Sequence, residues 1–309
     1  DKTKPTCKSS GGNSNWTNES RTIKGTCSDE GGSGCVDDVT KTIDKETNGS
    51  VSPGTVYDNA GNSTTCSGVT VKIDKTAPTC SSISGASTVW TNNNRYVNVE
   101  CTDNLSGCTS TTYNKTFTTE GTTDSITIKD NANNQRNCTV NKYIDKTAPK
   151  VENYDYEFLG DGSICQNWTY RDVQTLNYRA RFYNIKGYDP TVNGTHSDVE
   201  YFQIRVLPSA WVRSDNGSRT PIGTTKYFDV YNLKVKNTQN GINHYTIDPI
   251  EVSVPYNNTL YGRTSSYCFD WCVNVAVCDS AGNCEQTLAS AGLGSLQQCQ
   301  KKYNNSQGY

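Results

Sequence analysis

The sequence has no methionine, only two histidines and few hydrophobic residues. Its hydrophobic content is 33% and its mean hydropathy is −0.72, so a short domain built from it has little apolar core. No run of 18 apolar residues occurs, and we therefore expect no membrane span in this chain. The chain shows no signal peptide, and we expect it to be a fragment or a processed form whose export signal lies upstream.

Charge and histidine content argue against two kinds of partner. The net charge is −2 and the basic residues form no cluster or stripe, so we expect no nucleic-acid partner. His196 and His244 are too isolated to form a metal cage, and the 14 cysteines include no CxxC pair with zinc spacing. The cysteines instead predict disulfides, and with them an oxidising, extracytoplasmic compartment.

Catalytic motifs are also missing. The sequence has no G-x-S-x-G elbow, no H-E-x-x-H and no phosphate-binding loop. Carboxylates are plentiful, but a carboxylate pair without known geometry is not evidence for acid–base chemistry. His196 lies in a segment of loop composition. We therefore predict that the protein is not an enzyme and has no catalytic residue.

What the sequence does contain is a repeated motif. D-K-T-x-P starts at Asp1, Asp74 and Asp145, at intervals of 73 and 71 residues, and a fixed period is typical of tandem repeats. A tryptophan follows each start and a D-x-A-x-N turn precedes each end; these are Trp16, Trp90 and Trp168, and Asp58–Asn62, Asp130–Asn134 and Asp279–Asn283. We predict a first repeat at 1–73, a second at 74–144, an enlarged third at 145–287, and a polar tail at 288–309.

Hydrophobic residues alternate with polar ones at period two, whereas helical periodicity is nearly absent. The clearest case is the stretch from Phe269 to Val277, where Phe, Trp and Val occupy every second position. Such alternation, punctuated by Gly, Asn and Ser, predicts antiparallel β-strands with one apolar face. We therefore predict an all-β fold made of packed sheets.

The D-K-T-x-P start and the D-x-A-x-N turn resemble the bacterial immunoglobulin-like repeats of secreted and surface proteins. The resemblance covers residues 1–150 well, but only the two ends of the remainder; residues 182–262 form an expansion without a counterpart. It implies tandem immunoglobulin-like β-sandwiches stabilised by disulfides, with the third enlarged. The Cys-Trp-Cys pattern of antibody domains is not indicated, because these cysteines lie elsewhere.

The first two repeats each carry four cysteines, for which three pairings are possible. The resemblance implies that all four gather at one pole of the module, and Gly-rich turns separate the second cysteine from the third. We therefore predict the pairs Cys27–Cys35, Cys101–Cys108, Cys7–Cys66 and Cys80–Cys138. Each bridge is worth about 2–4 kcal/mol.

The third repeat and the tail carry six cysteines, for which fifteen connectivities are possible. Cys278 and Cys284 bracket the D-x-A-x-N turn, and we predict that they pair across it. Cys165 is expected to pair with Cys268 or Cys272, and Cys299 with whichever of the two remains.

Aspartates at the repeat boundaries are the candidate metal ligands. By the resemblance, Asp74 meets Asp103 and Asp130, Asp145 faces Asp279, and Asp1 faces Asp58 or Asp29. Converging carboxylates suit Ca²⁺, which takes 6–8 oxygen ligands, and some adhesins with similar repeats bind Ca²⁺ at their junctions. The alternative is that these aspartates only cap turn amides and that the protein needs no cofactor.

Aromatic residues are concentrated in the third repeat, which predicts a binding surface there. The candidates are Tyr201, Trp211, Tyr227, Tyr231, Tyr256 and Tyr261. The alternative is that they fill the core of a larger domain, because Tyr favours strands.

The function that we expect is surface adhesion or surface architecture, by analogy with a fold that hosts many roles. Two repeats would form a stalk, and the third would be a head that binds a protein or glycan of a host or neighbouring cell. One alternative is a subunit of an extracellular filament that binds copies of itself by exchanging a strand or tail. Another is a carbohydrate-binding module.

Overall fold

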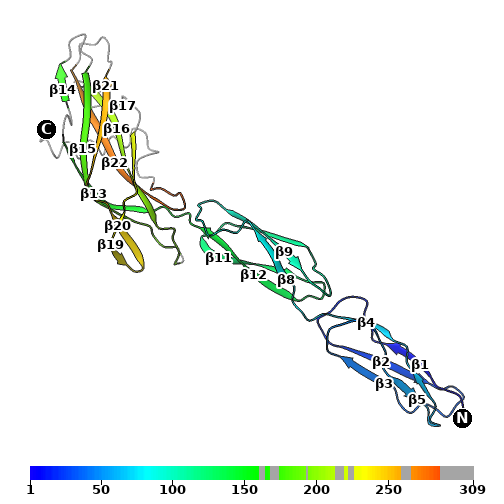
Figure 1. The fold of residues 1–309 in the computed structure, drawn as a ribbon. Helices are drawn as coiled ribbons and strands as arrows, with labels where there is room; N and C mark the ends of the chain where they lie inside the picture. Colours follow the sequence, from blue (N-terminus) through cyan, green and yellow to red (C-terminus); the bar gives the residue numbers. More distant parts are fainter. Residues whose placement is uncertain are drawn as a thin grey trace. The chain divides into compact units, whose positions relative to one another are not determined.

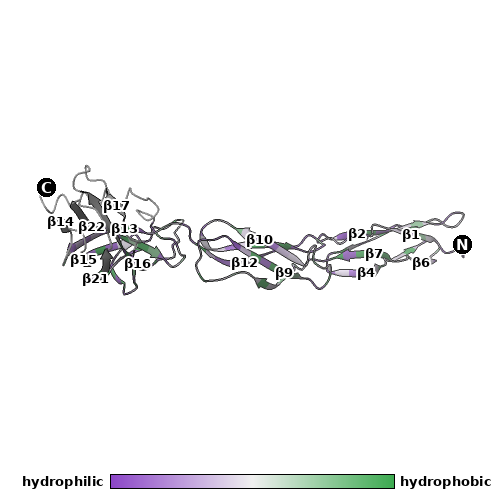
Figure 2. Cartoon of the chain, turned by 90° about the horizontal axis from the view of Figure 1, so that it is seen from above, coloured by the Kyte–Doolittle hydropathy of each residue, from purple (hydrophilic) through white to green (hydrophobic). Residues whose placement is uncertain are grey.

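The computed structural model describes residues 1–159, 164–167, 174–192, 194–212, 219–221, 226–258 and 266–285. Every regular element in these ranges is a β-strand, so the prediction of an all-β fold is confirmed (Figure 1). Hydrophobic and hydrophilic residues occur within single strands (Figure 2), as expected for strands with two unlike faces. None of the described residues belongs to a helix long and apolar enough to cross a membrane.

The first repeat contains three small antiparallel sheets. They are β1 (Thr6–Ser10), β2 (Arg21–Ser28) and β3 (Val39–Ile43); β4 (Thr47–Val51) and β7 (Val69–Ile73); and β5 (Thr55–Tyr57) and β6 (Ser63–Thr65). Ile23, Ile43, Val71 and Ile73 form its buried apolar cluster. Four aliphatic side chains are a small core, so this repeat needs further stabilisation.

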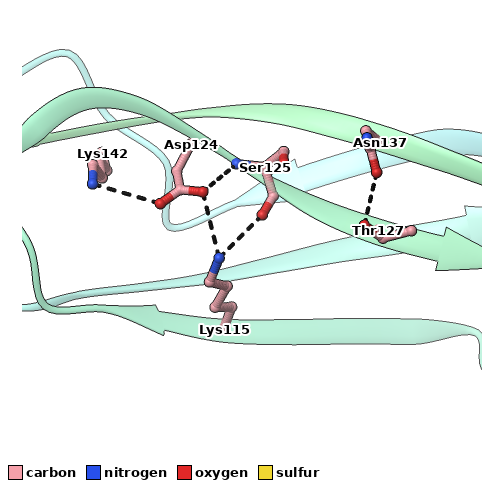
Figure 3. Close-up of polar contacts among 6 residues, drawn as sticks. All are labelled: Lys115, Asp124, Ser125, Thr127, Asn137 and Lys142. Carbon is pink, nitrogen blue, oxygen red and sulfur yellow. Dashed lines mark hydrogen bonds and ion pairs between the residues drawn. The ribbon is translucent and has the colours of Figure 1, made fainter.

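The second repeat has a similar pattern with fewer, longer strands. One sheet holds β8 (Thr79–Ser84), β9 (Arg95–Thr102) and β10 (Thr112–Phe117), and another pairs β11 (Gly121–Lys129) with β12 (Gln135–Ile144). Asp124 of β11 lies between the ammonium groups of Lys115 and Lys142, at 3.4 and 3.5 Å (Figure 3). These contacts link β11 to β10 and β12.

The third repeat contains two five-stranded sheets. One holds β13 (Lys150–Phe158), β15 (Gln174–Tyr188), β19 (Lys234–Gln239), β20 (Ile242–Thr246) and β21 (Ile250–Asn258). The other holds β14 (Ile164–Asn167), β16 (Val199–Val212), β17 (Arg219–Pro221), β18 (Lys226–Val230) and β22 (Ser266–Asp279). Both sheets contribute to one buried cluster, which includes Phe182, Val252, Phe202 and Val275.

In the stretch 269–277 the structure buries residues on both faces of the strand, whereas the sequence predicts one buried apolar face. Val275 and Val277 are buried as predicted, but Asn274 and Ala276 on the opposite face are buried too. At these two positions β22 pairs with β16. Arg205 and Gln203 of β16 stand opposite Asn274 and Ala276, and long side chains in such positions cover their partners.

Five disulfides close the described part of the chain. They are Cys7–Cys66, Cys27–Cys35, Cys80–Cys138, Cys101–Cys108 and Cys278–Cys284, the pairings that the sequence analysis predicts. The predicted pairings of Cys165, Cys268, Cys272 and Cys299 lie outside the described side chains, although the backbone of Cys165 stands opposite Cys268 between β14 and β22. Structural disulfides of this number indicate an oxidising environment.

The chain divides into two compact units. One comprises Asp1–Ser87, Arg95–Phe117 and Thr123–Lys142, and the other comprises Thr88–Asn94, Thr118–Thr122 and Tyr143–Tyr309. Each group of aspartates considered below lies within a single unit.

Candidate metal centres

Three groups of three aspartates each bring one carboxylate oxygen per residue to within 4.8 Å of the others. The first triad is Asp1, Asp29 and Asp58; the second is Asp74, Asp103 and Asp130; the third is Asp145, Asp189 and Asp279. Two oxygen ligands of one Ca²⁺, each about 2.3–2.6 Å from the ion, are at most about 5 Å apart. Each triad therefore has the spacing that one shared cation needs.

The leading aspartate of each triad comes from the D-K-T motif. One of its oxygens accepts the N–H of the threonine two residues on, and the other accepts the N–H of a distant serine. The threonines are Thr3, Thr76 and Thr147, at 2.8, 3.0 and 3.0 Å, and the serines are Ser33, Ser106 and Ser197, at 2.8, 3.0 and 2.6 Å. The short contact is an Asx turn, which holds the carboxylate near its own backbone.

The last aspartate of each triad comes from the D-x-A-x-N turn. Its carboxylate accepts both the backbone N–H and the side-chain amide of the asparagine four residues on. These asparagines are Asn62, Asn134 and Asn283, and all six distances are 2.7–2.8 Å. The same side-chain amides donate to the backbone carbonyls of Asp1, Asp74 and Asp145, so each asparagine ties the last aspartate to the first.

The middle aspartate accepts an N–H from a residue in the left-handed backbone conformation. For Asp29 and Asp103 the donors are Gly34 and Gly107, at 2.9 and 2.8 Å, with φ of 83° and 75°. For Asp189 the donor is Asp198, at 2.8 Å, with φ of 71°. Each donor directly follows the serine that binds the leading aspartate, so two consecutive N–H groups serve two carboxylates, as in an anion-binding nest.

Exposure distinguishes the three triads. Asp1 is exposed and Asp29 is half-buried, whereas Asp58 is buried. In the second triad only Asp103 is half-buried. All three carboxylates of the third triad are buried: Asp145 is 3% exposed, and Asp189 and Asp279 are fully buried. A cation would thus be least hydrated in the third triad.

The pKa values of two equivalent aspartates reflect this difference. Burial opposes ionisation of Asp58, but hydrogen bonds from Asn62 and neighbouring amides outweigh it and lower its pKa. Asp279 accepts the same kind of hydrogen bonds, yet burial, helped by the charge of Asp145, raises its pKa to about 6. Burial and the charges of Asp145 and Asp279 also raise the pKa of Asp189 to about 8.

One buried oxygen tests whether the third triad fits a cation. Oδ2 of Asp189 accepts the N–H of Asp198, but Oδ1 has no hydrogen-bond partner. A buried carboxylate oxygen without a partner is costly, unless a cation binds it. The donor set is made of oxygens only, which suits a hard cation such as Ca²⁺ rather than zinc.

The structure thus groups the predicted residues Asp74, Asp103 and Asp130, and it groups Asp145 with Asp279. Sequence reasoning missed Asp189, because it lies in the expansion that has no counterpart in the short repeats. A signal was nevertheless present. Ser197 and Asp198 correspond to Ser33-Gly34 and Ser106-Gly107, and Asp189 lies between the end of β15 and Pro190.

Three of the predicted aromatic residues, Tyr201, Tyr227 and Tyr231, have described side chains. Tyr201 contacts Tyr231 with a ring-centroid distance of 5.0 Å, and Arg205 lies 5.8 Å from the ring centroid of Tyr227. Tyr227 and Tyr231 are 57% and 60% exposed. Trp211 and Tyr256 lie on β16 and β21 with side chains outside the described part, and Tyr261 lies outside it entirely.

A pocket of about 590 Å³ opens beside β15 and β19. Its lining includes Arg181, Lys186, Lys236 and Tyr183, and Glu157 is the one acidic member among the described residues. Lys186 approaches Lys236 closely enough to lower the pKa of that lysine, first through a side-chain hydrogen bond. Glu157 pairs with Arg181 at 3.7 Å, so the two lysines leave the pocket with excess positive charge.

Comparisons with protein families, curated proteins and solved structures gave no significant match.

Proposed function

We propose that this chain is an extracellular, non-enzymatic surface protein in which Ca²⁺ ions join disulfide-closed β-repeats. The supporting observation is that one arrangement of three aspartates occurs three times, with the same hydrogen-bonded turns each time. A turn-capping role explains the individual contacts, but it does not explain why three carboxylates converge in every repeat. Converging anions repel one another unless a cation lies between them.

The three repeats are proposed to be immunoglobulin-like β-sandwiches. In support, the D-x-A-x-N turn joins β5 to β6 in the first repeat and β11 to β12 in the second. In the third it follows β22, which contributes Val275 and Val277 to the buried core. The shared disulfide pattern of the first two repeats supports the same relationship.

A cation in the second triad would stiffen the chain where one repeat leads into the next. The backbone N–H of Asp74 donates to the carbonyl of Thr17 in the first repeat, while its carboxylate accepts the N–H of Ser106 in the second. Asp145 is held likewise, by the carbonyl of Thr91 and the N–H of Ser197. A shared ion would fix these aspartates relative to the turns that follow.

The third repeat is proposed to act as the binding head of an adhesin. Tyr227 and Tyr231 expose large aromatic surfaces beside Arg205, and aromatic and arginine side chains are enriched at the energetic centres of protein interfaces. The partner would be a protein or glycan on a host or neighbouring cell.

The pocket favours a second candidate function, recognition of an acidic glycan. Lys186 and Lys236 offer ammonium donors to a carboxylate or sulfate group, and Tyr183 offers an aromatic ring to a sugar. A glycan array probed with the full chain would distinguish the two functions. Selective binding of acidic glycans that is lost in Lys236→Glu would favour the pocket over the tyrosine surface.

Calcium binding is tested with the oxidised full chain, stripped with EDTA and returned to Ca²⁺. We expect bound Ca²⁺ in equilibrium dialysis and a higher melting temperature, because a ligand bound only by the native state stabilises it by about 2.7 kcal/mol at 100 times its Kd. An unchanged melting temperature together with no bound Ca²⁺ would refute the proposal.

Adhesion is tested by measuring how the chain binds to cells after Tyr227→Ala and Tyr231→Ala. We expect binding to weaken at least about tenfold, as is usual for aromatic hot spots. Tyr96→Ala is the matched control, because Tyr96 is 53% exposed but lies in the second repeat. Equal losses in all three variants would argue against a binding surface in the third repeat.

A further inference from the structure

The loop that carries the middle aspartate is closed differently in the third repeat. In the first repeat Cys27 lies two residues before Asp29, and Cys35 directly follows Gly34; these cysteines form a disulfide. In the second repeat Cys101 and Cys108 flank Asp103 and Gly107 in the same way. Both loops are therefore held by a covalent bond beside the triad.

In the third repeat the corresponding positions hold Gly187 and Val199, which cannot form a disulfide. The loop between Asp189 and Asp198 is also longer than its counterparts. It is nevertheless built on the same hydrogen bonds, from Ser197 to Asp145 and from Asp198 to Asp189. This longer loop is held against the turn at Asp279 without a covalent bond. The N–H of Ser280 donates to the carbonyl of Asp198, and the N–H of Ala281 donates to Oγ of Ser197.

The side chains of the third triad are arranged for a charged ligand. Asp145, Asp189 and Asp279 are all buried, and none of them takes part in an ion pair among the described residues. Hydrogen bonds satisfy the two oxygens of Asp145 and of Asp279. Oδ1 of Asp189 alone has no partner, so this triad combines three converging carboxyl groups with an unsatisfied buried acceptor.

The first two triads lack that combination. Asp29 and Asp103 are half-buried, so water can reach them, and each lies in a loop closed by a disulfide. Burial strengthens the attraction between ionised carboxylates and a bound cation, because less solvent screens their charge. The affinity for a hard cation should therefore be highest in the third repeat.

We propose that the third triad is the tightest Ca²⁺ site of the chain, and that the bound ion holds the loop between Asp189 and Asp198 as disulfides hold its counterparts. This inference rests on the proposed function, because it requires that the chain binds Ca²⁺. It adds that Ca²⁺ fills the third triad before the other two, and that the bound ion holds a loop in the third repeat that disulfides hold in the first two.

The test is a calorimetric Ca²⁺ titration of the oxidised, EDTA-stripped full chain. Two variants are titrated in the same way: Asp189→Asn, and Asp103→Asn at the equivalent position of the second triad. We expect one tight phase in the native chain. Asp189→Asn should weaken that phase at least about 100-fold, because Ca²⁺ affinity follows the charge of the ligands. Asp103→Asn should leave it unchanged.

Hydrogen exchange on the native chain gives a second measurement that needs no variant. Ca²⁺ should slow exchange of the amides around Ser197 and Asp198 at least about tenfold, and should slow those of Ser33-Gly34 and Ser106-Gly107 less. Replacing Ca²⁺ by Mg²⁺ should protect less, since Mg²⁺ demands stricter geometry and keeps its waters.

The outcomes separate this inference from the proposed function. Tight binding that survives Asp189→Asn, or that is lost in Asp103→Asn, would overturn the order of filling while Ca²⁺ binding itself stands. Equal protection of all three loops would overturn the structural role. If no form of the chain binds Ca²⁺, the proposed function fails and this inference fails with it.

Discussion

The first and third repeats carry the same aspartate triad in opposite surroundings. In the first, the triad is partly exposed, its loop is closed by Cys27–Cys35, and the apolar core has four residues. In the third, the triad is buried, its loop has no flanking disulfide, and the core joins two five-stranded sheets. The same turn chemistry thus occurs beside a small core with a disulfide-closed loop and beside a larger core with a loop that no disulfide flanks.

This comparison explains why equivalent aspartates titrate differently. At Asp58 the hydrogen bonds lower the pKa by more than burial raises it. At Asp279 burial and the charge of Asp145 raise the pKa by more than the hydrogen bonds lower it. Local turns therefore set the position of a carboxylate, while the surrounding packing sets its charge state.

The largest loss of stability is expected from shortening a core side chain of the third repeat. Phe182→Ala should lower the free energy of unfolding by about 3–5 kcal/mol, because Phe182 is fully buried between the two sheets. Hydrogen exchange of the full chain would locate the loss, which should be confined to residues 143–285. A comparable loss in the first repeat would contradict the view that the repeats are stabilised separately.

Removing a loop disulfide should make the first repeat resemble the third. Cys27→Ser with Cys35→Ser should cost about 2–4 kcal/mol and should make exchange at Ser33-Gly34 sensitive to Ca²⁺. Cys278→Ser with Cys284→Ser is the matched control, because that bridge closes a turn of similar length. If Ca²⁺ slows exchange at Ser33-Gly34 no more in this variant than in the native chain, disulfide and cation are not interchangeable.

The left-handed residue of the loop can be tested in the second repeat. Gly107→Ala should cost about 1–2 kcal/mol, because φ at Gly107 is 75° and side chains other than Gly, Asn and Asp disfavour that conformation. An added Cβ would meet only Nδ2 of Asn131, at 3.6 Å, so the cost is conformational rather than steric. Gly107→Asp, which copies Asp198, should cost less, and thermal unfolding of both variants measures the difference.

The smallest effect is expected at Asp124, which is outside any triad. Burial opposes its ionisation, but the N–H of Ser125 and the ammonium groups of Lys115 and Lys142 outweigh it and lower the pKa (Figure 3). A carboxyl with a lowered folded-state pKa stabilises the fold above its unfolded-state pKa, near 4, and this contribution is lost as the pH falls through the folded-state value.

Asp124→Asn should therefore cost about 1 kcal/mol or less at pH 7, with the cost shrinking below pH 4. Urea unfolding at pH 7 and at pH 3 measures both values. Asp37→Asn is a control, because the side chain of Asp37 is exposed and forms no hydrogen bond or ion pair with the described residues. A cost that does not change with pH would show that Asp124 acts through packing rather than charge.

The sequence by itself determined the features that depend on neighbouring residues. Alternation at period two gave the strands, and the spacing of the D-K-T and D-x-A-x-N motifs gave the aspartates at each repeat boundary. The turns at Asp74 and Asp130 are made by hydrogen bonds to residues two and four positions away, so they can be read locally. The cysteines of the first two repeats follow the same repeated spacing, whereas their predicted pairing came from the resemblance to immunoglobulin-like repeats.

Only the tertiary structure decided which carboxylate completes the third triad and how strongly each triad is buried. Asp189 meets Asp145 and Asp279 because the C-terminal end of β15 lies next to that of β22. The hydrogen bond from Ser197 to Asp145 joins residues 52 positions apart. Motif spacing could not reveal this inside an expansion without a counterpart. Burial, which raises the pKa of Asp189 and leaves Oδ1 without a partner, depends on the packing of the whole repeat.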